Sequence, residues 1–292
     1  MSARHSSPPH PEARFAPTEG ECVVCAHPTP KPIPTHNHVL AALPLNDLER
    51  LLPDLEPVPL PVGWTVHGPG DRETCLYFLA AGIVSRLYVT ENGASAAFAV
   101  TGSEGVIGVT SFLGGEGTPS HAVVLTAGYA YRMRPDLLKQ EFERDGPLPH
   151  LLLRYTQALI DQVGQTAVCN RHHSLEQQLC RWVLSCLDRL PSNELTMTQE
   201  LIADMLGVRR EGVTEAARRL QDAGLIHYSR GHIAVLDRPR LEARACECYA
   251  VVKRQYDRLL CRDNTTGNAG ATDEWRQYRP HGGEHPNPAE LT

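Results

Sequence analysis

The spacing of apolar positions changes near Pro135 and predicts two kinds of secondary structure. Between Val58 and Met133, short apolar or alternating segments are separated by turns such as GPGD, ENG and GGEGTP. Short strands with regular turn signals predict an antiparallel β-roll, jelly-roll-like in form. The pair Asn92-Gly93 predicts a hairpin, because both residues tolerate positive φ. A short helix is expected before the roll, at 46–52.

After Pro135 the period is helical, and the longest predicted helix runs over Leu148–Val168. One stripe of this helix is almost free of charge, and it suits either a subunit interface or packing on the chain's own β-domain. The spacing does not choose between the two. Ser174 is a plausible N-cap for the next helix, which stops before Pro191. The stripe consists of Leu151, Leu152, Tyr155, Ala158, Leu159, Gln162 and Val163.

The segment 195–236 has the pattern of two helices joined by a tight turn. Thr198 is a plausible cap for the first helix, and Gly207 supplies the turn. The second helix begins near Arg209 or Arg210, and at 100° per residue its apolar positions share one face. These are Val213, Ala216 and Leu220, and opposite them lie Arg210, Glu211, Thr214, Arg218 and, less centrally, Glu215.

That polar face is costly to bury but suits a DNA major groove. An Arg can pair with guanine there, and a Glu can accept from cytosine. Two short strands around Arg230-Gly231 predict a β-hairpin wing, from which Arg230 and His232 can reach the DNA backbone. The alternative is a helical subdomain with a merely solvated face. The order of helix, Gly turn, Arg-rich helix and wing favours DNA binding.

Local charge agrees with this interpretation. The whole chain of 292 residues has a formal net charge of -6. Within Gly207–Arg240, however, seven Arg stand against four acidic residues. A positive patch confined to one module is what phosphate contact requires.

With these elements the sequence resembles the Crp/Fnr superfamily of transcription regulators. The resemblance covers roughly 37–260 and is strongest in TQELIADMLGVRREGVTEAARRL, with SLEQQLCRWVL before it. It implies an α+β chain with a cyclic-nucleotide-binding-like antiparallel β-roll, a long dimerisation helix and a C-terminal winged helix-turn-helix. It also implies double-stranded DNA, a second copy bound through 148–168, and RNA polymerase as partners.

The resemblance also implies roles for individual residues. Arg210 and Glu211 match the family's base-reading Arg-Glu pair, while Thr198, Gln199 and Arg209 match positions that touch phosphate. Glu215 stands where relatives often carry an Arg, so an altered operator is expected. With Thr214, Arg218 and Arg230, these residues form the predicted DNA-binding site.

The sensor half departs from relatives that bind cyclic AMP. Their ribose-binding Gly-Glu step is Gly108-Val109 here, and their Arg-Ser phosphate pair falls in Pro119–Ala122, which has no Arg. Their base-contacting Thr-Ser pair becomes Val163-Gly164. Since a buried phosphate needs a charged or dense donor set, cyclic AMP is not the expected effector. The weak candidate pocket consists of Val109, Ser120, His121 and Val163.

The nine cysteines suggest a second hypothesis. Cys22, Cys25 and His27 are weak candidate ligands for a metal or an iron–sulfur cluster, which needs four ligands. The alternative function is therefore a metal-sensing, redox-sensing or small-molecule-binding protein in which DNA binding is secondary. Cys246 and Cys248 are interpreted as packing on one helix, where residues two apart do not share a face. Cys169 beside His172-His173 has no pocket signature, so no enzyme is expected.

The expected division of the chain follows from these elements. No run of 18 apolar residues and no secretory signal is present, so no membrane contact and a cytoplasmic location are expected. The domains are a disordered tail at 1–36, the β-roll at 37–146, the dimerisation helix and hinge at 147–172, the winged helix-turn-helix at 173–262 and a disordered tail at 263–292.

Overall fold

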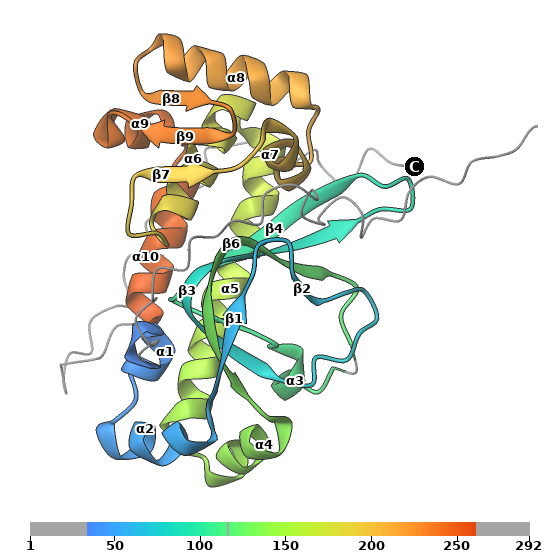
Figure 1. Cartoon of the computed structure of the whole chain (residues 1–292), viewed down its shortest axis with the longest axis vertical. Helices are drawn as coiled ribbons and strands as arrows, with labels where there is room; N and C mark the ends of the chain where they lie inside the picture. Colours follow the sequence, from blue (N-terminus) through green and yellow to red (C-terminus); the bar gives the residue numbers. More distant parts are fainter. Residues whose placement is uncertain (1–33, 116, 261–292) are drawn as a thin grey trace, which may run out of the picture. The chain divides into compact units, whose positions relative to one another are not determined.

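The structure is a computed structural model and describes residues 34–115 and 117–260 (Figure 1). Most of both predicted tails therefore lies outside the described residues, although Pro34–His36 forms a 3₁₀ turn, η2. No helix among the described residues combines the length and apolar character needed to span a bilayer.

The first half is an antiparallel sheet, as the turn spacing predicts. Its strands run in the order β1-β6-β3-β4, with β2 paired to β6 and β5 paired to β3. The strands are β1 (Glu56–Leu60), β2 (Thr65–His67), β3 (Leu76–Val89), β4 (Ser95–Thr101), β5 (Val106–Ile107) and β6 (His121–Met133). Short helices flank them: α1 (His38–Ala41), α2 (Leu45–Leu51), η3 (Leu52–Asp54), α3 (Thr110–Leu113) and α4 (Pro135–Arg144).

The hairpin between β3 and β4 turns at Asn92-Gly93, but only one of the two residues has the predicted backbone. Gly93 has a φ of 81°, whereas Asn92 is not among the residues with positive φ. Asn92 instead accepts a hydrogen bond from the backbone N of Ala94 at 3.1 Å through its side chain. Asn thus stabilises the turn as a local acceptor rather than through the left-handed region.

The long helix α5 (Pro147–His172) packs its predicted apolar stripe on its own chain. Tyr155 is fully buried and donates a hydrogen bond from its hydroxyl to the carbonyl of Val106 at 3.0 Å. The Tyr155 ring packs directly against Gly105, where any larger residue would clash, since a Cβ at this position would lie 2.2 Å from the ring. Of the two interpretations, packing on the chain's own β-domain is the one observed for this stripe.

A different face of α5 remains exposed. Leu153 is 49% exposed, Ile160 60% and Val168 49%. They recur after seven and eight residues, the spacing of one helix face. The face available to a partner is therefore not the stripe that the sequence pattern singles out.

The second half contains the helix-turn-helix elements in the predicted order (Figure 1). They are α6 (Leu175–Leu187), β7 (Glu194–Thr196), α7 (Gln199–Leu206), α8 (Arg210–Asp222), β8 (Ile226–Ser229), β9 (His232–Val235), α9 (Arg238–Arg244) and α10 (Cys248–Leu260). Ser174 caps α6 with a complete capping box, in which its side chain and that of Gln177 bond each other's backbone N–H. The three strands form one small antiparallel sheet, β7-β9-β8.

The last helix, α10, comes after the wing in the sequence and packs on α5. The Tyr256 hydroxyl of α10 donates to Oε1 of Gln162 at 3.0 Å, and its ring lies 6.2 Å from that of Tyr155. The described C-terminal end thus contacts the long helix of the same chain.

Candidate DNA-binding site

The first helix of the motif, α7, begins and ends where the sequence predicts. The Thr198 side chain accepts a hydrogen bond from the backbone N of Leu201 at 3.2 Å, which satisfies one free donor of the first turn. Gly207 ends the helix in the left-handed region with a φ of 68°. Between them, Ile202 and Met205 are buried in the core of this half.

The second helix, α8, buries one face and exposes the other. Val213, Ala216, Ala217 and Leu220 are at most 4% exposed. Arg209, at the N-cap, and Arg210 and Glu211, in the first turn, are exposed. Among the described residues, these three side chains have no hydrogen-bond or ion-pair partner. A charged helix start without protein partners is available to an external polar ligand.

The remaining predicted contact residues of α8 already have partners. The hydroxyl of Thr214 lies 2.7 Å from Oε1 of Gln199, which ties the first turn of α7 to α8. Glu215 Oε1 lies 3.0 Å from Nη2 of Arg218. The hydrogen bonds from Arg218 lower the pKa of Glu215. The structure therefore gathers the predicted residues on one surface, with Arg210 and Glu211 unpartnered and Glu215 paired.

The wing is a two-residue hairpin between β8 and β9. Arg230 has a φ of 49° and Gly231 of 81°, which is the left-handed pair of a type I′ turn. The backbone N of Met197 donates to the carbonyl of Gly231 at 2.7 Å, so the wing is fixed beside the start of α7. Arg230 is exposed at the wing tip, and Nδ1 of His232 lies 3.2 Å from the hydroxyl of Thr196.

The four residues proposed for the effector pocket come from three parts of the structure. Val109 precedes α3 and Val163 lies on α5, each half-buried against one hydrophobic cluster. Ser120 and His121 are buried at the start of β6. None of the four is among the residues that line the cavity beside β4 or the one beside β2.

An acidic side chain that sequence reasoning missed lies at the start of α3. The backbone N of Thr110 donates to Oε2 of Glu73 at 2.8 Å, and His67 Nε2 lies 2.8 Å from Oε1. Burial alone would raise the pKa of Glu73, but the hydrogen bonds from His67 and Thr110 outweigh it and lower the pKa to about 2. The helix start that follows Gly108-Val109 therefore already holds a carboxylate of the chain itself.

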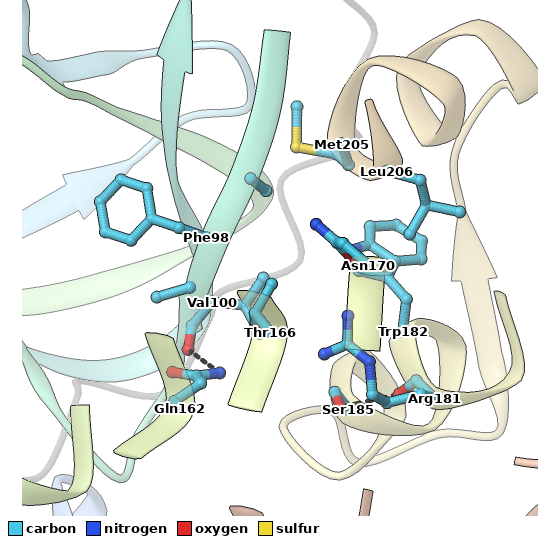
Figure 2. Close-up of a pocket in the computed structure, with 12 residues that line it drawn as sticks. Phe98, Val100, Gln162, Thr166, Asn170, Arg181, Trp182, Ser185, Met205 and Leu206 are labelled. Atoms are coloured by element: carbon cyan, nitrogen blue, oxygen red, sulfur yellow. Dashed lines mark hydrogen bonds between the residues drawn. The ribbon is translucent and has the colours of Figure 1, made fainter. Parts of the chain in front are cut away.

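A small pocket lies between β4 and the helices α5, α6 and α7 (Figure 2). Gln162 donates to the carbonyl of Val100 at 3.3 Å on its β4 side. Arg181 and Trp182 line the α6 side, at 8% and 4% exposure. Their Nε and Nε1 atoms have no hydrogen-bond partner among the described residues.

The cysteines of the described residues are arranged differently from the prediction. Cys22, Cys25 and His27 lie outside the described residues. Cys246 and Cys248 do not lie on one helix, because α9 ends at Arg244 and α10 begins at Cys248. The non-helical connection lets both thiols face Cys169, and the prediction that they point apart is wrong. The Cys169-x₃-His173 spacing is the sequence signal that would have suggested a cluster.

The fold and this surface define a DNA-binding regulator with a winged helix-turn-helix, and comparison with known proteins identifies the family. A model described as Crp-like helix-turn-helix domain matches residues 177–244, and one described as cyclic nucleotide-binding domain matches 57–145. The chain belongs to the Crp/Fnr family of transcription regulators, as its sequence motifs predict.

Relatives of known name and structure agree with this assignment. A global nitrogen regulator from Nostoc sp. is 26% identical over 59% of this chain and 81% of its own length. FixK2 from Bradyrhizobium japonicum has the same fold, with a TM-score of 0.58 at 16% identity over 66% of this chain and 98% of the other. A Crp-family regulator from Thermus thermophilus matches with a TM-score of 0.55 at 20% identity over 65% and 96%.

Proposed function

We propose that this regulator binds a pseudo-palindromic operator as a homodimer and reads it with Arg210 and Glu211. The observation that carries the assignment is the start of α8, where both side chains are exposed and have no hydrogen-bond or ion-pair partner in the part of the chain that the structure describes. The helix packs its other face in the core, so its orientation is fixed by Val213, Ala216 and Leu220. An Arg presented in this way can pair with guanine in the major groove.

The other predicted residues take positioning roles in this proposal. Thr198, Gln199 and Arg209 would contact phosphate at the two helix starts, and Arg230 would contact it from the wing. Thr214, Glu215 and Arg218 continue along the exposed face of α8. Two recognition helices of a dimer would enter half-sites about one helical turn, roughly 34 Å, apart.

The test is a selection of random duplex DNA on the full-length protein, followed by affinity measurements on the selected site. Arg210→Ala should relax the base preference at one position per half-site and cost roughly 1–3 kcal/mol. Arg230→Ala should weaken all sequences alike. Arg144→Ala, an exposed arginine on α4, is the matched control and should leave binding unchanged. If the Arg210 and Arg230 variants changed affinity and base preference in the same way, the assignment of base contacts to α8 and phosphate contacts to the wing would be contradicted.

We further propose that the effector of the β-roll is not cyclic AMP. The Glu73 carboxylate at the start of α3 supports this, because a phosphate placed there would meet a like charge. Calorimetric titration with cyclic AMP should give no saturable heat, and micromolar binding would refute the proposal.

RNA polymerase remains a predicted partner. At 26% identity, the name of the nitrogen regulators does not transfer their target genes to this chain.

A further inference from the structure

Four side chains with metal-binding atoms meet where the long helix ends. Cys169 lies in the last turn of α5 and His173 is the C-cap of that helix, four residues later. Cys246 lies in the connection between α9 and α10, and Cys248 is the first residue of α10. Their four ligand atoms all lie within 4.8 Å of one another. The three cysteines are at most 4% exposed, so the cluster is closed to solvent on the sulfur side.

The distances fit one small ion rather than a larger centre. Cys169 Sγ and Cys246 Sγ are 3.5 Å apart, and Cys248 Sγ is 3.4 Å from Nδ1 of His173. Tetrahedral zinc bonds sulfur at about 2.3 Å and imidazole nitrogen at about 2.0–2.1 Å, which separates neighbouring ligand atoms by about 3.5–3.8 Å. An iron–sulfur cluster distributes its four ligands over two or more iron atoms, so ligands on different irons lie farther apart than those of a single ion.

The groups around the cluster orient its ligands. Nε2 of His173 lies 3.3 Å from Oε1 of Glu247, so the Nδ1 atom faces the sulfurs. The side chain of Gln165 donates to Cys248 Sγ at 3.0 Å, and that of Gln178 donates to the carbonyl of His173 at 2.9 Å. A carboxylate on the far nitrogen of a ligating histidine is the usual outer partner in zinc sites.

The local charge also suits a thiolate site. Arg181 is 8% exposed and has no partner for its Nε atom among the described residues. The charge of Arg181 acts on the Cys169 thiol, so this guanidinium lies near the cluster. A divalent ion with three thiolates carries one net negative charge, which a buried guanidinium compensates.

We propose that Cys169, His173, Cys246 and Cys248 bind one Zn²⁺ that joins the end of α5 to the start of α10 and the residues just before it. The ion would link residues 77 positions apart in the sequence, as between Cys169 and Cys246. Helix α6 of the DNA-binding half begins at Leu175, two residues after His173. The site would therefore hold in place the short connection between α5 and α6, which leads into the helix-turn-helix. This role does not depend on which bases the protein reads.

The test begins with the metal content of the reduced, full-length protein. One zinc per chain is expected, with release on titration of thiols by an organomercurial. Replacement by Co²⁺ should give the intense sulfur-to-cobalt absorption of a site with three thiolates and the visible bands of tetrahedral geometry. This spectrum is measured on the unaltered chain and so does not depend on whether a variant folds.

Variants then assign the ligands. Cys169→Ser, Cys246→Ser and Cys248→Ser should each lose the bound zinc or weaken the cobalt absorption. Cys75→Ser in the β-roll and a Cys22→Ser, Cys25→Ser double variant are the controls and should keep one zinc per chain. Glu247→Ala, which leaves all four ligands in place, should weaken metal affinity about 10-fold.

Three results would overturn the proposal. The first is failure of the reduced chain to bind Zn²⁺ or Co²⁺ at one equivalent. The second is loss of the metal in the Cys22, Cys25 variant but not in the Cys246 variant. The third is a Cys169–Cys246 disulfide in the protein isolated with its thiols blocked. The first would identify the cluster as cysteine packing, the second would place the metal in the N-terminal segment, and the third would make the pair a redox site.

Discussion

Glu215 and Arg218 form an ion pair on the exposed face of α8, with 3.0 Å between Oε1 and Nη2. The same guanidinium lies 2.9 Å from Oδ2 of Asp222, and Glu215 also lies 3.3 Å from Nη1 of Arg219. An acidic residue at this position therefore pairs with two arginines, each of which also has a second acidic partner: Asp222 for Arg218 and Glu176 for Arg219.

Replacing Glu215 by Gln should consequently strengthen nonspecific DNA binding. The change removes a charge that repels phosphate and loosens Arg218. If Arg218 then contacts one more phosphate, the slope of log affinity against log salt becomes steeper by about 1. Fluorescence anisotropy on random duplex over a salt series measures this. Glu143→Gln, an exposed acid on α4, should leave the slope unchanged, and an identical slope in both variants would mean that Arg218 stays off the DNA.

Much of the DNA-binding half could be predicted from the sequence, because its signals are local. Thr198, Gly207 and Gly231 each determine backbone geometry within a few residues, and the apolar positions of α8 follow one helical period. The pairing of Glu215 with Arg218 is also a short-range helix contact. The partners of each charged side chain could not be predicted, because exposure alone does not say which arginine is free.

Contacts between distant segments could not be predicted in this way. Tyr155 reaches Val106, Glu73 reaches Thr110, and Cys169 reaches Cys246, and no period or spacing connects these residues. The stripe on α5 illustrates the limit, because an apolar face of that length fits a partner or the chain's own sheet equally well. Only the three-dimensional packing shows that Leu153 and Ile160, outside the stripe, remain exposed.

The largely buried pair of Glu104 and Arg189 should be a strong determinant of stability. Nη2 of Arg189 lies 2.7 Å from Oε1 of Glu104, with side-chain exposures of 9% and 12%. Glu104→Gln leaves a buried guanidinium without its counter-charge and should cost about 3–5 kcal/mol in the free energy of unfolding. Urea titration followed by tryptophan fluorescence provides the measurement.

The control for this pair is Glu143→Gln. Its partner Lys139 lies 3.8 Å away, and both side chains are more than half exposed. Breaking such a surface pair should cost less than about 1 kcal/mol. Equal costs for the two substitutions would show that Glu104 and Arg189 are solvated in solution.

The Glu73 carboxylate should make stability depend on acid pH. Its pKa is about 2 in the folded chain, below the ordinary value of 4.5, so the folded state holds the proton less tightly than the unfolded state. The stabilisation is therefore fully present above about pH 5 and is lost as the pH falls towards 2. It amounts to at most about 3 kcal/mol.

Glu73→Gln should remove this part of the pH dependence, which unfolding titrations between pH 3 and pH 7 would detect. Glu49→Gln, an exposed acid on α2, should keep the dependence of the unaltered chain. A Glu73 variant that loses stability with acid as steeply as the unaltered protein would show that other carboxylates are responsible.

The exposed face of α5 should be the dimer interface. Leu153, Ile160 and Val168 present apolar surface on one side of the helix, and water contact with such side chains is unfavourable. A second copy of the same helix is the partner that family membership implies, and a two-fold interface would bring each residue near its counterpart.

Ile160→Glu would place two carboxylates in that interface and should convert the dimer to a monomer in light scattering coupled to size exclusion. Val62→Glu, which alters an apolar residue 53% exposed before β2, should leave the mass unchanged. The monomeric variant should also bind the full operator with the affinity of a single half-site, whereas a dimer that survives Ile160→Glu would place the interface on another surface.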